Sequence, residues 1–203
     1  MFKNLNELLI AYKENDPAAR GKLSVLLLYP GVHAIIYHRI AHWFYLRKCF
    51  FISRLISQWA RLATGIEIHP GAQIGKRLVI DHGMGIVIGE TTIIGDDCLL
   101  YQGVTLGGSG KEKGKRHPTL GNNVLVGAGA KVLGSFKVGD NARIAANAVV
   151  LNEIPDHATA VGVPAKVVRV AGERVEMLDH THIPDPVAQA IKKLTDRVEA
   201  LEK

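Results

Sequence analysis

The chain has 203 residues, 47% of them hydrophobic, and a formal net charge of +6, which fits a folded protein of one large domain or two small ones. Its two cysteines, Cys49 and Cys98, lie far apart and form no C-x-x-C pair, so neither a disulfide framework nor a thiolate metal site is expected. No segment has the pattern of a secretory signal or the length of an apolar membrane span, so we expect a cytoplasmic protein.

The positive charge is concentrated at the N-terminal end. Residues 1–61 contain nine Lys and Arg against three Asp and Glu, a difference of +6, whereas residues 62–203 contain sixteen of each. A basic helical segment can contact nucleic acid or an anionic membrane. The sequence has no zinc-finger spacing, RNP-type aromatic pattern or lysine-rich tract. We therefore expect no nucleic acid and no membrane as partners, and interpret the basic residues as a solvated or oligomer-facing helix surface.

Residues 1–62 are predicted to form an N-terminal helical segment. Asp16 followed by Pro17 has the pattern of a helix N-cap with proline at the first helical position. Pro30 and Gly31 then interrupt the chain, and apolar residues recur at three- and four-residue spacing over residues 33–62. The resulting apolar face is too broad for a helix alone in water, so we expect it to pack on another helix or another subunit.

Residues 63–170 follow a period of six. Aliphatic residues recur at Ile68, Ile74, Ile80, Ile88, Ile94, Leu100, Leu106, Leu120, Val126, Val132, Val138, Ile144 and Val150, and seven of these thirteen are followed by glycine. This is the hexapeptide signature of a parallel β-helix, in which each hexad supplies one short strand and one turn and three hexads form a triangular coil. The aliphatic position points inward, and a small residue four positions later, such as Cys98, fills the corner. We therefore expect Cys98 to be a core residue and not a reactive thiol.

The period is broken twice. The step from Ile80 to Ile88 is eight residues and contains Asp81-His82, whereas the step from Leu106 to Leu120 is fourteen and ends in Arg116-His117-Pro118. Solenoids place insertions on one face, which is often the functional face. After Val150 the repeat fades, and residues 171–203 are predicted to form a tail with a short amphipathic helix over residues 187–203.

Polar residues at the two breaks are candidates for chemistry. One coil is about eighteen residues, so Glu67 and His82 belong to the same or adjacent rungs, and a carboxylate beside an imidazole suits a general base near neutral pH. The alternative for His82 is a corner histidine bonded to a carbonyl. Arg116 can clamp a carboxylate with two hydrogen bonds, and its alternative is a solvated loop residue.

Several strings resemble those of one enzyme family, and together they extend over residues 16–170. They are D-P-A from residue 16, G-I-E-I-H-P from residue 65, D-H-G from residue 81, G-I-V-I-G-E-T from residue 85, V-T-L-G-G from residue 104, K-R-H-P from residue 115 and G-V-P-A from residue 162. The chain resembles serine O-acetyltransferases, which open the route from serine to cysteine. The hexapeptide repeat is shared by many acyltransferases, whereas the combination of D-H-x-x-G-I-V-I-G-E-T with T-L-G-G and R-H-P is much more specific.

The resemblance implies a mostly β fold, a left-handed parallel β-helix with an N-terminal α-helical segment and a short C-terminal helix. It also implies a homotrimer with active sites between neighbouring subunits. The implied reaction transfers acetyl from acetyl-CoA, a co-substrate, to the hydroxyl of L-serine, giving O-acetyl-L-serine and CoA. No permanently bound cofactor and no metal are implied.

The resemblance also assigns roles to individual residues. His82 would be the base that takes the serine hydroxyl proton before direct attack on the thioester, and Glu67 would orient His82. Asp16 and Asp81 would bind the substrate ammonium. The substrate carboxylate would bind Arg116, with His117 beside it to hold the substrate or the developing oxyanion. Backbone groups near Gly108, Ala128 and Ala146 would line the acetyl-CoA groove, and Arg143 would meet a phosphate.

Three departures from the family pattern are visible. The family commonly has Asp where this chain has Glu67. The Glu67 side chain is one methylene longer, so its carboxylate must approach the imidazole with a different geometry. The N-terminal segment is short beside the longer family members, in which it joins two trimers into a hexamer, so the resemblance leaves trimer and hexamer open. Members that bind the next enzyme of the pathway, O-acetylserine sulfhydrylase, typically end in isoleucine, whereas this chain ends Glu202-Lys203. Feedback inhibition by L-cysteine, nearly isosteric with serine, is expected from the resemblance.

Three alternatives have different chemistry on the same scaffold. A γ-type carbonic anhydrase would use His69, His82 and His117 as zinc ligands, an acetyltransferase of sugars or xenobiotics would keep the acetyl donor, and a non-catalytic solenoid would only bind other proteins. The single histidine in the second insertion and the contexts D-H and R-H-P suit a zwitterionic substrate better than zinc. The charged residues gathered at both breaks favour an enzyme over a scaffold.

Overall fold

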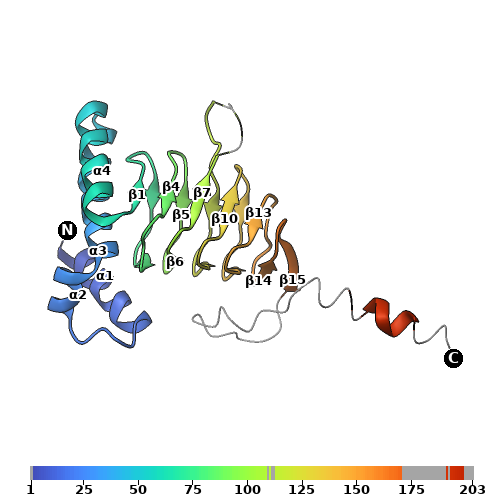
Figure 1. Ribbon diagram of the computed structural model, residues 1–203. Helices are drawn as coiled ribbons and strands as arrows, with labels where there is room; N and C mark the ends of the chain where they lie inside the picture. Colours follow the sequence, from blue (N-terminus) through green and yellow to red (C-terminus); the bar gives the residue numbers. More distant parts are fainter. Residues whose placement is uncertain (1, 109, 111–112, 171–190, 192, 199–203) are drawn as a thin grey trace.

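Four helices form the N-terminal part of the chain in the computed structural model, which describes residues 2–108, 110, 113–170, 191 and 193–198 (Figure 1). The helices are α1 Phe2–Asn15, α2 Lys22–Leu28, α3 Pro30–Leu46 and α4 Phe50–Thr64. Pro30 is the first residue of α3, where its missing N–H costs no hydrogen bond. Gly65, with φ of 71°, ends α4 in the left-handed conformation that glycine adopts most readily.

Two details of the predicted helical segment are wrong. Asp16 follows α1 instead of starting a helix: its Oδ1 accepts a hydrogen bond from the Ala18 N–H at 2.7 Å, which closes a local turn. The apolar run over residues 33–62 is not one helix, because residues 47–49 divide it into α3 and α4; these two helices pack against each other, which confirms that the apolar face packs on another helix. The outer face of α4 remains uncovered in the single chain, with Phe51 81% exposed.

No single helix among the described residues is long and apolar enough to cross a membrane. Only α2 and α3 taken together meet that criterion of length and composition, and they are bent by 71° at their junction.

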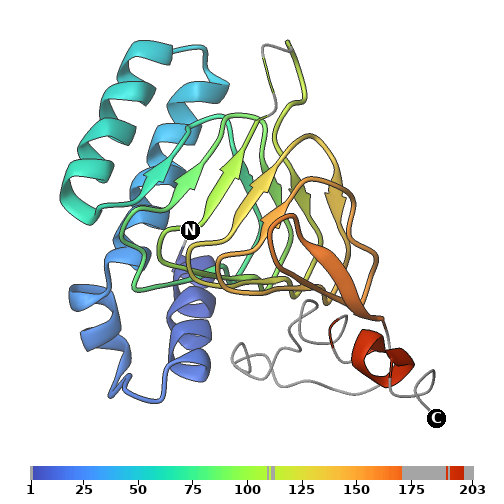
Figure 2. The ribbon, with the colours of Figure 1, turned by 45° about the vertical axis from the view of Figure 1, so that its right-hand side comes forward.

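Short strands then wind into a prism with three parallel sheets (Figure 2). The first sheet contains β1 Glu67–Ile68, β4 Val87–Ile88, β7 Thr105–Gly107, β10 Lys131–Leu133 and β13 Val149–Val150. The second contains β2 Gln73–Ile74, β5 Ile93–Ile94, β8 Thr119–Leu120 and β11 Lys137–Val138. The third contains β3 Val79–Asp81, β6 Leu99–Tyr101, β9 Leu125–Val126, β12 Arg143–Ile144, β14 Ala158–Val161 and β15 Lys166–Val170. The last strand, β15, pairs with β14 in an antiparallel hairpin.

The inside of the prism confirms the hexapeptide interpretation. All thirteen aliphatic residues of the repeat are buried except Ile74, which is half-buried, and the small residues four positions later, including Cys98, are buried as well. The left-handed parallel β-helix predicted for this chain is thereby confirmed. Residues 191 and 193–198 are helical, as predicted for the tail. The rest of the tail from residue 171, including most of the predicted helix over 187–203, lies outside the described residues.

The two breaks in the period lie at different edges of the prism. The chain passes from the third sheet to the first through Asp81-His82, between β3 and β4. It passes from the first sheet to the second between β7 and β8, where the described parts of the inserted loop project from the prism (Figure 2). We call these the His82 edge and the His117 edge.

The two cysteines should differ in reactivity. Burial raises the pKa of the Cys98 thiol to about 12, and its Sγ donates to the Gly121 carbonyl at 3.1 Å, whereas Cys49 is exposed. We expect a thiol reagent at neutral pH to modify one cysteine of the native protein and both in denaturant, as counted by mass spectrometry. The Cys49→Ser variant is the control and should remain unmodified until it unfolds; rapid modification of that native variant would contradict the buried position of Cys98.

Candidate active site

His82 lies on a tight, exposed turn at the His82 edge. Its φ is 58° and that of Gly83 is 73°, so two consecutive residues adopt the left-handed conformation. The turn is closed by the Gly83 N–H, which donates to the Asp81 carbonyl at 2.7 Å. The His82 side chain is 73% exposed, with Nε2 3.9 Å from Asp81 Oδ1. The two extra residues of the period therefore present an imidazole outside the prism without removing Ile80 or Ile88 from its core.

Asp16 and Asp81 form an acidic pair around Tyr29. The Tyr29 hydroxyl donates to Asp16 Oδ2 at 2.5 Å. This hydrogen bond raises the pKa of Tyr29 to about 12, and burial and the charges of Asp16 and Asp81 act in the same direction. Two carboxylates from segments 65 residues apart thus lie near one hydroxyl, which is the arrangement that an ammonium group requires. The sequence predicted both carboxylates but gave no sign of Tyr29.

Glu67 is placed differently from the sequence expectation. Its carboxylate lies 3.5 Å from a guanidinium nitrogen of Arg54 and 3.5 Å from one of Arg61, both on α4. Within one chain the structure therefore brings Glu67 together with two arginines of the helical segment and does not bring it to His82. The carboxylate beside His82 is Asp81.

Thr91 holds the end of the inserted loop at the His117 edge. Its Oγ1 accepts hydrogen bonds from the backbone N–H groups of Arg116 at 3.0 Å and His117 at 3.1 Å. Its carbonyl accepts one from Lys115 Nζ at 2.7 Å. Arg116 Nη2 lies 3.2 Å from Glu90 Oε2, and Tyr45 donates to the other oxygen of Glu90 at 3.3 Å. The inserted loop at the second break of the period thus ends in a well-held Arg-His pair.

The His117 ring is buried in this edge. Burial lowers the pKa of His117, as does the charge of Arg116. A Cβ at position 89 would lie 2.1 Å from Nε2 of the ring, so glycine is required where the ring crosses the corner. Gly89 is therefore a site residue that the sequence analysis did not single out, although it stands in the G-I-V-I-G-E-T string.

The two groups lie at opposite ends of the outer face of β4. His82, Asp81 and Asp16 are grouped at the edge before this strand, and Arg116 with His117 at the edge after it. The exposed Val87 side chain stands between the two edges. One copy of the chain therefore forms each half of the predicted site at a separate edge, and the two halves do not meet within that copy.

The predicted acetyl-CoA residues divide between the same edges. Ala128 and Ala146 follow β9 and β12, and so belong to the His82 edge, where corner hydrogen bonds link successive coils. Three strand spacings separate the His82 corner from the Ala146 corner, about 14 Å along the axis. Gly108 lies at the His117 edge, where a Cβ would come within 3.3 Å of His117 Nε2. Arg143 lies on β12.

The described residues contain no group of three His, Cys, Asp or Glu side chains arranged to hold a metal ion. The three histidines named for a zinc site have separate settings in the chain. His69 Nδ1 accepts from the Gly71 N–H at 3.0 Å, His117 Nδ1 is bonded to Thr91, and His82 is at the other edge.

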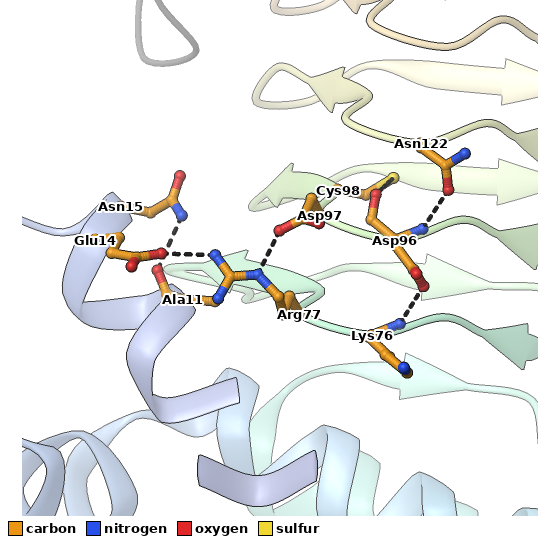
Figure 3. A network of polar contacts seen from close by, with 9 residues as sticks. All are labelled: Ala11, Glu14, Asn15, Lys76, Arg77, Asp96, Asp97, Cys98 and Asn122. Carbon is orange, nitrogen blue, oxygen red and sulfur yellow. Dashed lines mark hydrogen bonds and ion pairs between the residues drawn. The ribbon is translucent and has the colours of Figure 1, made fainter. Parts of the chain in front are cut away.

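A charged network fixes the end of α1 on the prism (Figure 3). Arg77 Nη2 lies 2.6 Å from Glu14 Oε2, and Arg77 Nε donates to Asp97 Oδ1 at 2.5 Å. Asp97 itself has φ of 57° at a corner between coils. Because Glu14 is two residues before Asp16, this network sets the position of the acidic pair relative to the prism. Sequence alone gave no signal for it, because its members are distant in the chain.

Comparison with known proteins agrees with this geometry. The family model of the bacterial transferase hexapeptide (six repeats) matches residues 117–152. Repeat and prism together define a hexapeptide-repeat transferase.

Relatives identify the family within this class. Over 100% of its length the chain is 57% identical to the serine acetyltransferase of Synechococcus elongatus, of which it covers 83%. Over 98% of its length it is 54% identical to that of Staphylococcus aureus, of which it covers 94%. The chain belongs to the serine acetyltransferase family and is an acyltransferase. This membership favours the acetyltransferase over the anhydrase, the sugar or xenobiotic enzyme and the non-catalytic solenoid.

Solved structures agree with the assignment. The crystal structure of Neisseria gonorrhoeae serine acetyltransferase is 41% identical, with a TM-score of 0.82, and the match covers 85% of this chain and 66% of that one. The same enzyme has been solved in complex with serine, at 42% identity and a TM-score of 0.80 over 83% of this chain and 69% of that one. Two further serine acetyltransferase structures, 42% and 40% identical, are complexes with cysteine and with CoA.

The Arg77 network should contribute measurably to stability. We expect Arg77→Gln to lower the free energy of unfolding by about 0.5–1 kcal/mol, because its ion pairs are partly exposed. The loss should shrink at high salt, as measured by urea unfolding in low and high sodium chloride. Lys137→Gln is the matched control, since Lys137 and Asp156 are 3.9 Å apart and half exposed. Equal effects of both substitutions would contradict a special role for Arg77.

Proposed function

We propose that the protein transfers acetyl from acetyl-CoA to the hydroxyl of L-serine, and that His82 is the general base. The observation that carries the proposal is the pairing of two half-sites with complementary charge. Asp16 and Asp81 at the His82 edge match an ammonium, and Arg116 at the His117 edge matches a carboxylate. A free amino acid carries an ammonium and a carboxylate on one carbon. When both are bound, the serine hydroxyl is directed to the His82 imidazole.

The proposed reaction uses the exposed imidazole of His82, which lies at the same edge as the acidic pair of Asp16 and Asp81. His82 takes the hydroxyl proton as the serine oxygen attacks the thioester carbonyl. As the carbon–sulfur bond breaks, the imidazolium returns the proton to the CoA sulfur, so no covalent enzyme intermediate and no resident cofactor are needed. Asp81, 3.9 Å from Nε2, stabilises the charged ring during this step.

Two copies of the chain are required to complete the site, and we propose a homotrimer. The half-sites lie at two different edges of one prism, so the His82 edge of one copy must face the His117 edge of the next. A ring of three prisms closes this head-to-tail contact. Val87, Met84 and Leu62, all exposed in one chain, lie on or beside the face between the edges and would be covered in such a contact.

Acetyl-CoA would lie along the His82 edge. Ala128 and Ala146 lie at later corners of the same edge as His82, so their backbone groups fit the predicted groove for the pantetheine arm. Gly108 would be contributed by the His117 edge of a neighbouring copy. Arg143 would meet a phosphate. L-cysteine would compete for the serine site, because its ammonium and carboxylate match the same half-sites.

The role of His82 can be tested by turnover. We expect His82→Ala to lower kcat by roughly 10²–10⁴, the usual contribution of a positioned general base, as measured by serine-dependent release of CoA thiol. His157→Ala is the matched control, because His157 is also exposed with a positive φ but lies in the turn before β14. A His82→Ala enzyme of normal kcat would remove His82 from the mechanism.

Mixed oligomers test whether the site is shared between copies. His82→Ala and Arg116→Ala should each be nearly inactive alone, since each lacks one half-site. When equal amounts are unfolded and refolded together, about a quarter of the interfaces should combine an intact His82 edge with an intact His117 edge. We expect about a quarter of the wild-type activity per subunit. Activity no higher than that of the separate variants would show that both half-sites must come from one chain.

A further inference from the structure

His117 and Thr91 share a hydrogen-bond arrangement that determines where the histidine carries its proton. The backbone N–H of Thr91 donates to His117 Nδ1 at 3.2 Å. The Thr91 hydroxyl oxygen lies 2.9 Å from the same nitrogen. A ring nitrogen that accepts from a backbone N–H has its lone pair in the ring plane occupied and carries no proton of its own. The neutral ring must then hold its proton on Nε2.

One acceptor near the Thr91 hydroxyl remains for its proton. Its oxygen already accepts the backbone N–H groups of Arg116 and His117. The nearby acceptor for the hydroxyl proton is His117 Nδ1, so both donors of Thr91 point to one nitrogen. Thr91 therefore fixes the position of the Arg-His pair through its oxygen and the tautomer of His117 through its two donors.

Nε2 is the free end of the ring. It lies against Gly89 and Gly108, where a Cβ would come within 2.1 Å and 3.3 Å of it. Among the hydrogen bonds formed by the described residues, none uses this nitrogen. The ring thus carries one N–H that has no partner among the described residues, near Arg116, and the backbone beside it is glycine at both positions.

The surrounding charges favour the neutral ring. Four charged or titratable groups act on His117, namely Arg116, Lys115, Glu90 and His69. Burial and the two cationic neighbours lower the pKa of His117, and only Glu90 opposes them. Protonation at Nδ1 would also require breaking the contact with the Thr91 N–H, which leaves a donor without an acceptor.

We propose that Thr91 is a positioning residue that locks His117 as a neutral Nε2–H donor, and that this donor binds an oxygen of the substrate carboxylate beside Arg116. The inference rests on the proposed function for the identity of the ligand, but not for the tautomer. It also separates the two histidines of the site. His117 has no free lone pair with which to accept a proton, whereas the exposed His82 ring is free to do so.

The tautomer can be read without any activity measurement. In the full-length protein labelled with ¹⁵N-histidine, two-bond ¹H–¹⁵N spectra distinguish Nδ1–H, Nε2–H and doubly protonated rings. We expect the His117 signal, assigned by its loss in His117→Gln, to show the Nε2–H form from about pH 6 to about pH 8. A charged ring or an Nδ1–H ring at pH 7 would overturn the proposal, whatever the substrate of the enzyme is.

Variants of Thr91 test the positioning role. Thr91→Val keeps the backbone N–H and the branched shape but removes Oγ1, whereas Thr91→Ser keeps the oxygen. We expect Thr91→Val to raise KM for serine about tenfold with kcat changed less than about threefold, since it loosens carboxylate contacts made in the ground state. Thr91→Val retains the Thr91 N–H at 3.2 Å but loses the closer hydroxyl donor at 2.9 Å, so its His117 ring should keep the Nε2–H form when neutral but accept a proton at Nδ1 at a higher pH than in the wild type.

Thr91→Ser should restore both readouts to within about twofold of the wild type. Wild-type KM and an unchanged His117 signal in Thr91→Val would overturn the role of Thr91, and so would a fall in kcat at constant KM, which would place the donor on the transition state instead. Failure of the proposed function would appear differently, as a wild-type enzyme that releases no thiol with serine.

Discussion

The constraint on which this structure depends is the length of its strands. Most have two residues, of which one points into the prism and the other outward, so each face has little room for functional side chains. A complete hexad also closes its corner in the same way each time. A side chain can leave this pattern only where the chain adds residues at a corner, and both additions in this protein carry the groups that the proposed chemistry needs.

The two edges have opposite characters for physical reasons. The His82 edge has an exposed imidazole beside the Asp81 carboxylate, which suits a group that must gain and lose a proton. The His117 edge has a buried ring and a guanidinium fixed by Thr91 and Glu90, which suits recognition of a charge that does not change. In the proposed trimer, Arg116 of one copy and His82 of the next would meet only across the contact between the two copies.

Local periodicity predicted the prism well because each hexad repeats one local geometry, and its aliphatic positions are buried as expected. It also located the corners of His82 and His117. The Asp-Pro capping pattern, a separate signal, failed at Asp16, because a turn and a helix start share this pattern and only the packing of α1 decides between them.

Periodicity failed for Glu67, whose partners Arg54 and Arg61 come from a helix whose position the repeat does not encode. Tyr29, Thr91 and Arg77 were missed for the same reason. Each acts through a contact between segments that are 13 to 63 residues apart.

The buried hydroxyl of Tyr12 has a further consequence. It accepts from the Ile80 N–H at 3.0 Å and donates to the Ile80 carbonyl at 3.3 Å, on β3, the outermost strand of the third sheet. Gly31 of α3 packs over the same carbonyl, where a Cβ would come within 2.5 Å. An open strand edge is a template for pairing with other chains. The helices thus seal the start of the β-helix against strand addition and aggregation, at the residue that precedes Asp81.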